Sequence, residues 1–170
     1  NILILISSRT TKKGNVTHVV MMTAQLRRVI LAQCYQGQLL RGVETGPSAL
    51  LNLLSFPFTQ RPIRTSELDD MREGLGRVRA LTAFSVKNNV FPVSVGGDHT
   101  VAAGSVRGSL DVHGRALKVL WIDAHADINT PRSSKTGNLH GMPVASLLHR
   151  FPPLVGSKKE DTPLLANQLT

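Results

Sequence analysis

Short apolar runs alternate with segments of helical periodicity through the middle of this chain. Apolar runs of strand length occupy residues 29–34, 90–95 and 119–122. In residues 66–87, apolar side chains recur at steps of three and four, which indicates an amphipathic helix that begins at a capping-box-like Ser-Glu-Leu-Asp. Shorter helices are expected after Pro47, after Thr100 and from Pro143. Strand-helix alternation of this kind predicts an α/β fold with a parallel sheet and right-handed crossovers.

The rest of the chain is less regular. With 170 residues, 41% of them hydrophobic, the chain is long enough for one domain with a sizeable core and too short for two. Residues 1–28 show no sustained period, which predicts a poorly specified N-terminal extension before a domain at 29–150. Residues 151–170 hold prolines and glycines without a periodic apolar pattern, so they are expected to form a loose tail.

Three potential metal ligands follow the apolar run 119–122 at every second position: Asp123, His125 and Asp127. An extended backbone turns alternate side chains to one face, so the three can converge. Two buried carboxylates beside an imidazole are costly without a cation, because the like charges repel and desolvation penalises each ionised form. The alternative is that Asp123 caps a turn and His125 is an ordinary core histidine.

A second strand end carries similar chemistry. The run 90–95 leads into Gly96-Gly97-Asp98-His99. Paired glycines allow a sharp turn, and the residues after them stand where open parallel sheets bind ligands, outside the carboxyl ends of their strands. If the strands are neighbours, His99 joins the three residues above in one cluster.

A polar loop follows at the same end of the sheet. Asn129, Thr136 and Asn138 are short hydrogen-bonding side chains that either hold a ligand or serve as ordinary turn formers. His140, flanked by Leu139 and Gly141, is either a solvated histidine or a proton carrier.

Composition narrows the classes of function. The formal net charge of +9 would suit an anionic partner, but the basic residues are scattered in pairs and aromatic residues make up only 4%, so no nucleic acid is expected. No uncharged apolar run reaches the ~20 residues of a membrane span, so no membrane association is expected. A single cysteine, Cys34, excludes an intramolecular disulfide and favours the cytoplasm. The first 43 residues are basic and contain no acidic residue, which leaves a mitochondrial transit segment as the alternative.

Taken together, these motifs resemble the arginase family of ureohydrolases over residues 29–150. Asn129 and the Gly-Asn-Leu-His-Gly loop are closer to arginase than to agmatinase or formiminoglutamase. The matching segments are Gly96-Gly97-Asp98-His99, the stretch from Asp123 to Pro131, the stretch from Gly137 to Gly141, and more weakly Gly42 to Pro47.

The resemblance implies a three-layer αβα fold of the arginase and deacetylase type with a mainly parallel sheet, commonly assembled as a trimer. It implies manganese-dependent hydrolysis of L-arginine to L-ornithine and urea by a hydroxide that bridges two Mn²⁺ ions. By the resemblance, His99, Asp123 and Asp127 would bind one Mn²⁺, and His125 would bind the other, with Asp123 bridging the two ions. His140 would transfer a proton. Asn129, Thr136 and Asn138 would bind the α-carboxylate of the substrate.

One departure limits the resemblance. Arginases are longer, and their second half supplies an Asp-x-Asp pair and further acids that nothing between residues 144 and 170 matches. The expected fold is therefore incomplete at its C-terminal side, and the expected chain is a fragment. A non-catalytic chain that associates with full-length subunits, or another ureohydrolase such as agmatinase, is the alternative.

Overall fold

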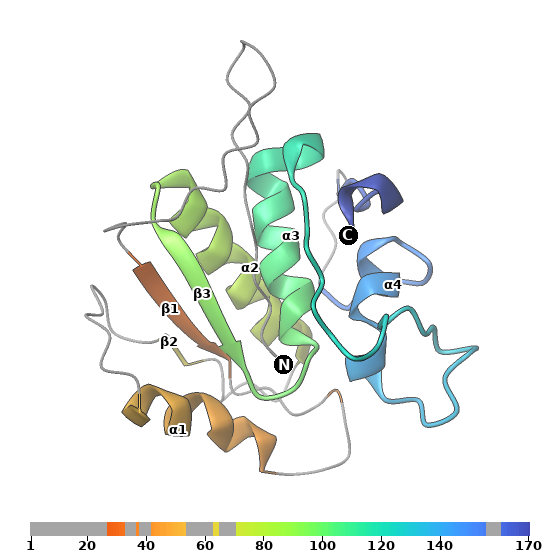
Figure 1. The fold of residues 1–170 in the computed structure, drawn as a ribbon, viewed down its shortest axis with the longest axis horizontal. Helices are drawn as coiled ribbons and strands as arrows, with labels where there is room; N and C mark the ends of the chain where they lie inside the picture. The colour runs from red at the N-terminus through yellow and green to blue at the C-terminus, as the bar shows by residue number, and fades with distance from the viewer. Residues whose placement is uncertain (1–26, 33–36, 38–41, 54–62, 65–70, 156–160) are drawn as a thin grey trace.

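The computed structural model describes residues 27–32, 37, 42–53, 63–64, 71–155 and 161–170 (Figure 1). These residues form three strands, four α-helices and short 3₁₀ turns. The strands are β1 (Arg27–Ala32), β2 (Ile63–Arg64) and β3 (Phe91–Gly96); the helices are α1 (Gly46–Leu53), α2 (Met71–Lys87), α3 (Val101–His113) and α4 (Pro143–Leu147); the 3₁₀ turns are η1 (Val43–Thr45), η2 (Gly114–Ala116), η3 (Leu139–Gly141) and η4 (Ala166–Gln168).

The sheet is parallel, with strand order β2-β1-β3. The chain moves one way across the sheet from β1 to β2 and the other way from β2 to β3. Right-handed crossovers then place α1 and α2 on opposite faces, and Figure 1 shows α1 on one side of the strands with α2 and α3 on the other. The predicted α/β fold, incomplete as expected, is confirmed.

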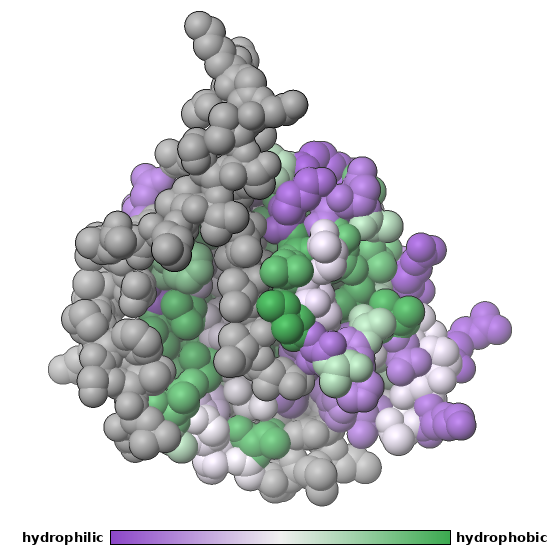
Figure 2. Space-filling model, viewed as in Figure 1, coloured by the Kyte–Doolittle hydropathy of each residue, from purple (hydrophilic) through white to green (hydrophobic). Residues whose placement is uncertain are grey.

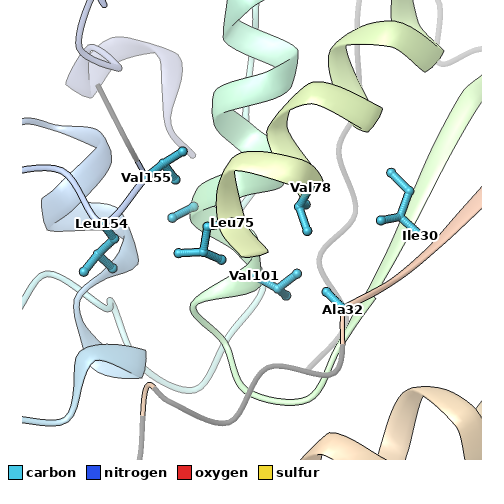
Figure 3. Close-up of a cluster of buried hydrophobic side chains, with 8 residues drawn as sticks. Ile30, Ala32, Leu75, Val78, Val101, Leu154 and Val155 are labelled. Carbon is cyan, nitrogen blue, oxygen red and sulfur yellow. The ribbon is translucent and has the colours of Figure 1, made fainter. Parts of the chain in front are cut away.

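The core lies between the sheet and helices α2 and α3. Ile30 and Ala32 of β1 are fully buried and pack in one cluster with Leu75 and Val78 of α2 (Figure 3). Leu75 and Val78 belong to the predicted apolar stripe, and each has no exposed surface. The helical period in the sequence therefore identified the buried face of α2 correctly.

Helix α3 packs closely on α2 because small residues face it. A Cβ atom on Gly104 would lie 2.8 Å from the backbone oxygen of Leu75, and one on Gly108 would clash with that of Arg79. All ten residues from Val101 to Leu110 are buried. The helix continues to His113 and is followed directly by the turn η2.

Residues 117–122 differ from the prediction. Their apolar run was expected to form a strand, but the structure has an extended segment with one isolated parallel bridge, Val119 to Leu169. The backbone N–H of Val119 donates to the Gln168 oxygen over 2.7 Å, and Thr170 N–H donates back to Val119 over 2.9 Å. An apolar run forms a ladder only where a neighbouring strand matches its length, and among the described residues the partner is limited to 168–170.

The C-terminal residues are also more ordered than predicted. In the described part of 151–170, Leu154 and Val155 are buried in the core, and Leu164 is 2% exposed. The Asp161 side chain is 8% exposed and lies 2.6 Å from the Arg79 guanidinium. The expectation of a loose tail is wrong for residues 151–155 and 161–170, because isolated buried side chains produce no periodic pattern.

Other expectations meet the described residues only in part. The predicted extension falls mainly on residues 1–26, outside the described residues, while Arg27 and Arg28 begin β1. Among the described helices, none is long and apolar enough to span a membrane.

Candidate metal centre

Two chain segments bring three candidate ligands together. His99 lies between the end of β3 and the start of α3, and Asp123 and Asp127 lie in the loop after the extended segment 117–121. One ligand atom from each residue lies within 4.8 Å of the others. His99 Nδ1 is 3.3 Å from Asp123 Oδ2 and 2.7 Å from Asp127 Oδ2. We call these three residues the acidic cluster.

The acidic cluster is buried but its oxygens are not satisfied. The side chains of His99, Asp123 and Asp127 are 12%, 2% and 6% exposed. Within the described part of the chain, Oδ2 of Asp123 and Oδ2 of Asp127 have no hydrogen-bond partner. His99 Nδ1, 2.7 Å from Asp127 Oδ2, forms an ion pair with this oxygen only when its ring is protonated. Buried acceptors that converge without a donor are costly, and a cation among them removes that cost.

The electrostatics differ between the two carboxylates. Burial and the nearby charge of Asp123 raise the pKa of Asp127, against a smaller opposing effect of His99. Burial would also raise the pKa of Asp123, but the backbone hydrogen bond from His125, together with the positive potential of His99 and His125, lowers it. Asp123 is thus the better stabilised anion of the pair.

His125 lies outside the acidic cluster. Its side chain is 83% exposed, and its Nδ1 is 3.5 Å from Asp123 Oδ1. The backbone N–H of His125 donates to the same oxygen over 2.9 Å. The two oxygens of Asp123 therefore face different histidines, Oδ2 toward His99 and Oδ1 toward His125.

The loop that carries Asp127 is held by the segment that follows it. Asp127 has a φ of 51°, a left-handed conformation that costs energy for a residue with a side chain. Its carbonyl oxygen accepts hydrogen bonds from Val144 and Ala145 at the start of α4, at 3.1 and 3.3 Å. Asn129 N–H donates to Gly141 over 3.2 Å. These bonds fix the conformation that turns the Asp127 side chain inward.

The predicted substrate-binding residues lie on a projecting loop. Asn129 and Thr136 are exposed and Asn138 is half-buried. Their hydrogen bonds are local: Ser133 Oγ donates to Asn129 Oδ1 over 3.1 Å, and Asn138 N–H donates to Thr136 Oγ1 over 3.3 Å. Figure 2 shows hydrophilic side chains over the part of this loop that extends farthest from the body. The structure places these residues near one another without bringing them into the acidic cluster.

Three further residues contribute in ways that the sequence did not reveal. Asp98, grouped with His99 in the sequence, is outside the cluster and binds Gly37 and Thr100 instead. The ring of Trp121 packs on that of His99, with centroids 5.0 Å apart. His140 is held by Gly37, to which its backbone N–H donates over 3.0 Å. The position of Trp121 before the ligand loop was a usable signal, but nothing in the sequence pattern marks Gly37.

Comparisons with known proteins show that the chain is similar to arginases. Rat (Rattus norvegicus) Arginase-1 is 46% identical over 84 residues, which cover 47% of this chain and 26% of the relative. An arginase of Staphylococcus aureus is 38% identical over 104 residues, covering 61% and 33%. The arginase structure from Bacillus subtilis superposes with a TM-score of 0.64 at 29% identity, covering 78% of this chain and 53% of that one.

A further structure, Entamoeba histolytica arginase in complex with L-ornithine, matches with a TM-score of 0.60 at 26% identity and covers 75% of this chain and 50% of that one. The chain thus spans about a third or less of the curated relatives' length and about half of the solved structures. The Arginase family model matches residues 28–159, more than half of the sequence, and this chain belongs to the arginase family.

Proposed function

We propose that the acidic cluster holds one divalent cation of an arginase-type centre, and that His125 helps to hold a second beside Asp123. The observation that carries this proposal is the pair of buried carboxylate oxygens, one on Asp123 and one on Asp127, that have no donor among the described residues. Membership of the arginase family supports the same reading. Carboxylate oxygens with imidazole nitrogen suit Mn²⁺, the metal we propose.

We propose the family reaction for this site, hydrolysis of L-arginine to L-ornithine and urea. A bound divalent cation supplies positive charge that lowers the pKa of water and so makes a nucleophile available near neutral pH. The water oxygen adds to the guanidinium carbon, the bond from that carbon to the side-chain nitrogen breaks, and the leaving amine takes a proton. The ornithine complex of the Entamoeba relative supports a substrate of this class.

His140 is the proposed proton carrier. Histidine is the side chain that most often transfers protons in general acid–base catalysis, and the segment of His140 is hydrogen-bonded to the ligand loop through Gly141 and Asn129. The projecting loop would present Asn129, Thr136 and Asn138 to the α-carboxylate of the substrate. Amide and hydroxyl groups on an exposed loop are free to donate to such an anion.

A second candidate is a non-catalytic chain that associates with full-length arginase subunits. Ile122 and Ile128 flank the ligand loop, and their exposed fractions are 54% and 59%. Large apolar side chains that are exposed favour contact with another polypeptide, which supports this candidate. The chain also spans only part of each relative reported above. Separately, we propose the homotrimer implied by the resemblance as the assembly of copies of this chain, and the cytoplasm as its location.

Purified chain with added Mn²⁺ and L-arginine tests the proposed reaction, with agmatine as the control substrate and Asp127→Asn as the control variant. Mn²⁺-dependent urea from arginine, absent in Asp127→Asn, is the expected result. Urea from agmatine alone would contradict the substrate. Saturable Mn²⁺ binding without urea would favour the non-catalytic candidate, and the absence of both would refute the metal site itself.

A further inference from the structure

Gly37, in the loop after β1, connects the end of β3 to the histidine proposed as proton carrier. Its backbone N–H donates to Asp98 Oδ2 over 2.8 Å. The other oxygen of Asp98 accepts from the backbone N–H of Thr100 over 2.8 Å and from the Thr100 hydroxyl. Asp98 is 6% exposed and Thr100 is fully buried. Asp98 therefore uses both oxygens on protein donors and is occupied as a structural anchor.

The approach of this loop to Asp98 is too close for any side chain. A Cβ atom on Gly37 would lie 2.5 Å from Thr100 Cγ2 and 2.8 and 2.9 Å from the two Asp98 oxygens. Both neighbours are buried and bonded, so neither can move aside at low cost. Glycine is required here by close contact.

The carbonyl group of Gly37 then fixes the imidazole of His140. It lies 3.0 Å from the backbone nitrogen of His140 and 3.1 Å from the ring nitrogen Nδ1. A carbonyl oxygen only accepts hydrogen bonds, so Nδ1 must carry the proton. In the neutral ring, Nε2 is then the only nitrogen able to accept one.

We propose that Asp98 and Gly37 are positioning residues that hold His140 in the Nδ1–H tautomer and leave Nε2 as its single proton acceptor. The value of this arrangement for catalysis rests on the proposed role of His140, whereas the tautomer itself can be measured without turnover. A ring fixed in one tautomer and orientation presents the same nitrogen to every substrate molecule. A free ring would divide its population between two nitrogens.

Nitrogen NMR spectroscopy of the imidazole rings in the full chain tests the proposal, with the His140 signals assigned by their loss in His140→Asn. Wild type should show a protonated Nδ1 and an unprotonated Nε2. Gly37→Ala should abolish this single-tautomer signature through the Cβ clash. Asp98→Asn should weaken the signature, because the carboxylate accepts hydrogen bonds on both oxygens, whereas an amide has only one acceptor oxygen. Gly76→Ala is the matched control, since a Cβ there meets nothing within 4 Å, and it should keep the wild-type signature.

The wild-type spectrum is decisive even if a variant fails to fold. A predominant Nε2–H tautomer, or an even mixture, in wild type would overturn the proposal, and so would an unchanged signature in folded Gly37→Ala and Asp98→Asn. Loss of urea formation in wild type with the Nδ1–H signature intact would refute the proposed reaction alone. General acid–base catalysis contributes about 10²–10⁴-fold to a rate. If wild type turns over arginine, Gly37→Ala should lower kcat by at most this factor, without an equal loss of Mn²⁺ affinity.

Discussion

Two groups of buried charges in this chain are built differently. Around Arg79, which we call the arginine network, Asp111 and Asp161 each form a two-point hydrogen-bonded pair with the guanidinium at 2.6–2.9 Å. Arg107 adds a bond of 2.7 Å to the Thr162 carbonyl. In the acidic cluster, by contrast, two carboxylates meet one imidazole and two oxygens stay without a donor in the described residues. The carboxylates of the first group are hydrogen-bonded within the protein, whereas we propose that a cation completes the second group.

Buried charge stabilises the fold in the arginine network and is proposed to bind a cation in the acidic cluster. The hydrogen bonds that Arg79 donates to Asp111, together with those it donates to Asp161 and the negative charges of both carboxylates, raise the pKa of Arg79 and keep it ionised. This network ties α2 and α3 to residues 161–162, which lead into the segment that bridges to Val119. In the acidic cluster, by contrast, the buried oxygens of Asp123 and Asp127 remain without a hydrogen-bond partner in the described residues, which is unfavourable. Such a cost persists at sites that bind ligands, where stability is exchanged for function.

The largest effect is expected from breaking the arginine network. Arg79→Met should lower the free energy of unfolding by about 3–5 kcal/mol, because it removes the two-point hydrogen-bond partner of the buried Asp161 carboxylate. Urea denaturation measures the loss. Arg77→Met on the same helix is the control: Arg77 is 53% exposed and pairs with Glu73 at 3.4 Å, so its loss should stay within about 0.5 kcal/mol. Equal losses in the two variants would contradict the structural role assigned to the network.

Removing one charge from the acidic cluster should have effects of opposite sign with and without metal. Without metal, Asp127→Asn should raise stability on the order of 1 kcal/mol, because it relieves repulsion from Asp123 and supplies a donor. With Mn²⁺ at a hundred times its Kd, wild type should gain about 2.7 kcal/mol while the variant gains none. Thermal unfolding with chelator and with Mn²⁺ measures both. A variant that is less stable than wild type in both conditions would show that the cluster is a structural pair.

A smaller effect is expected at the exposed edge of the site. His125→Ala should change the free energy of unfolding by no more than about 0.5 kcal/mol, since the side chain is 83% exposed. It should reduce the affinity of the tightest Mn²⁺ site by at most about tenfold, whereas His99→Ala should abolish that site. Calorimetric titration distinguishes the two. Equal losses in both variants would place His125 in the first site and contradict the separation of the two Asp123 oxygens.

The sequence predicted the acidic cluster better than it predicted the backbone that carries it. The pattern of Asp123, His125 and Asp127 after an apolar run, with His99 after a strand, predicted one cluster of four ligands. The structure brings His99, Asp123 and Asp127 together and leaves the His125 side chain 83% exposed. The pattern was not enough to show that, within the described part of the chain, the run 119–122 pairs with residues 168–170. Strand pairing depends on residues distant in sequence, which a local pattern does not contain.

The same limit explains what was missed elsewhere. Asp161 reads as an acid in an irregular tail, yet its side chain is buried against Arg79 from a helix 82 positions earlier. Gly37 has no periodic signal, since its role depends on Asp98 and Thr100 coming within contact distance. Helix α2, in contrast, was predicted well because its buried face is written in a local repeat.

Titration with Mn²⁺, monitored by the fluorescence of Trp121, tests most directly whether His99, Asp123 and Asp127 form a cation site. Trp121 is the only tryptophan in the chain. The centroid of its ring lies 5.0 Å from the centroid of the His99 ring. We expect a saturable change in emission in wild type and in Arg77→Met, which chelator reverses and which is absent in Asp127→Asn. No saturable change in wild type, or the same change in Asp127→Asn, would contradict a cation site formed by His99, Asp123 and Asp127.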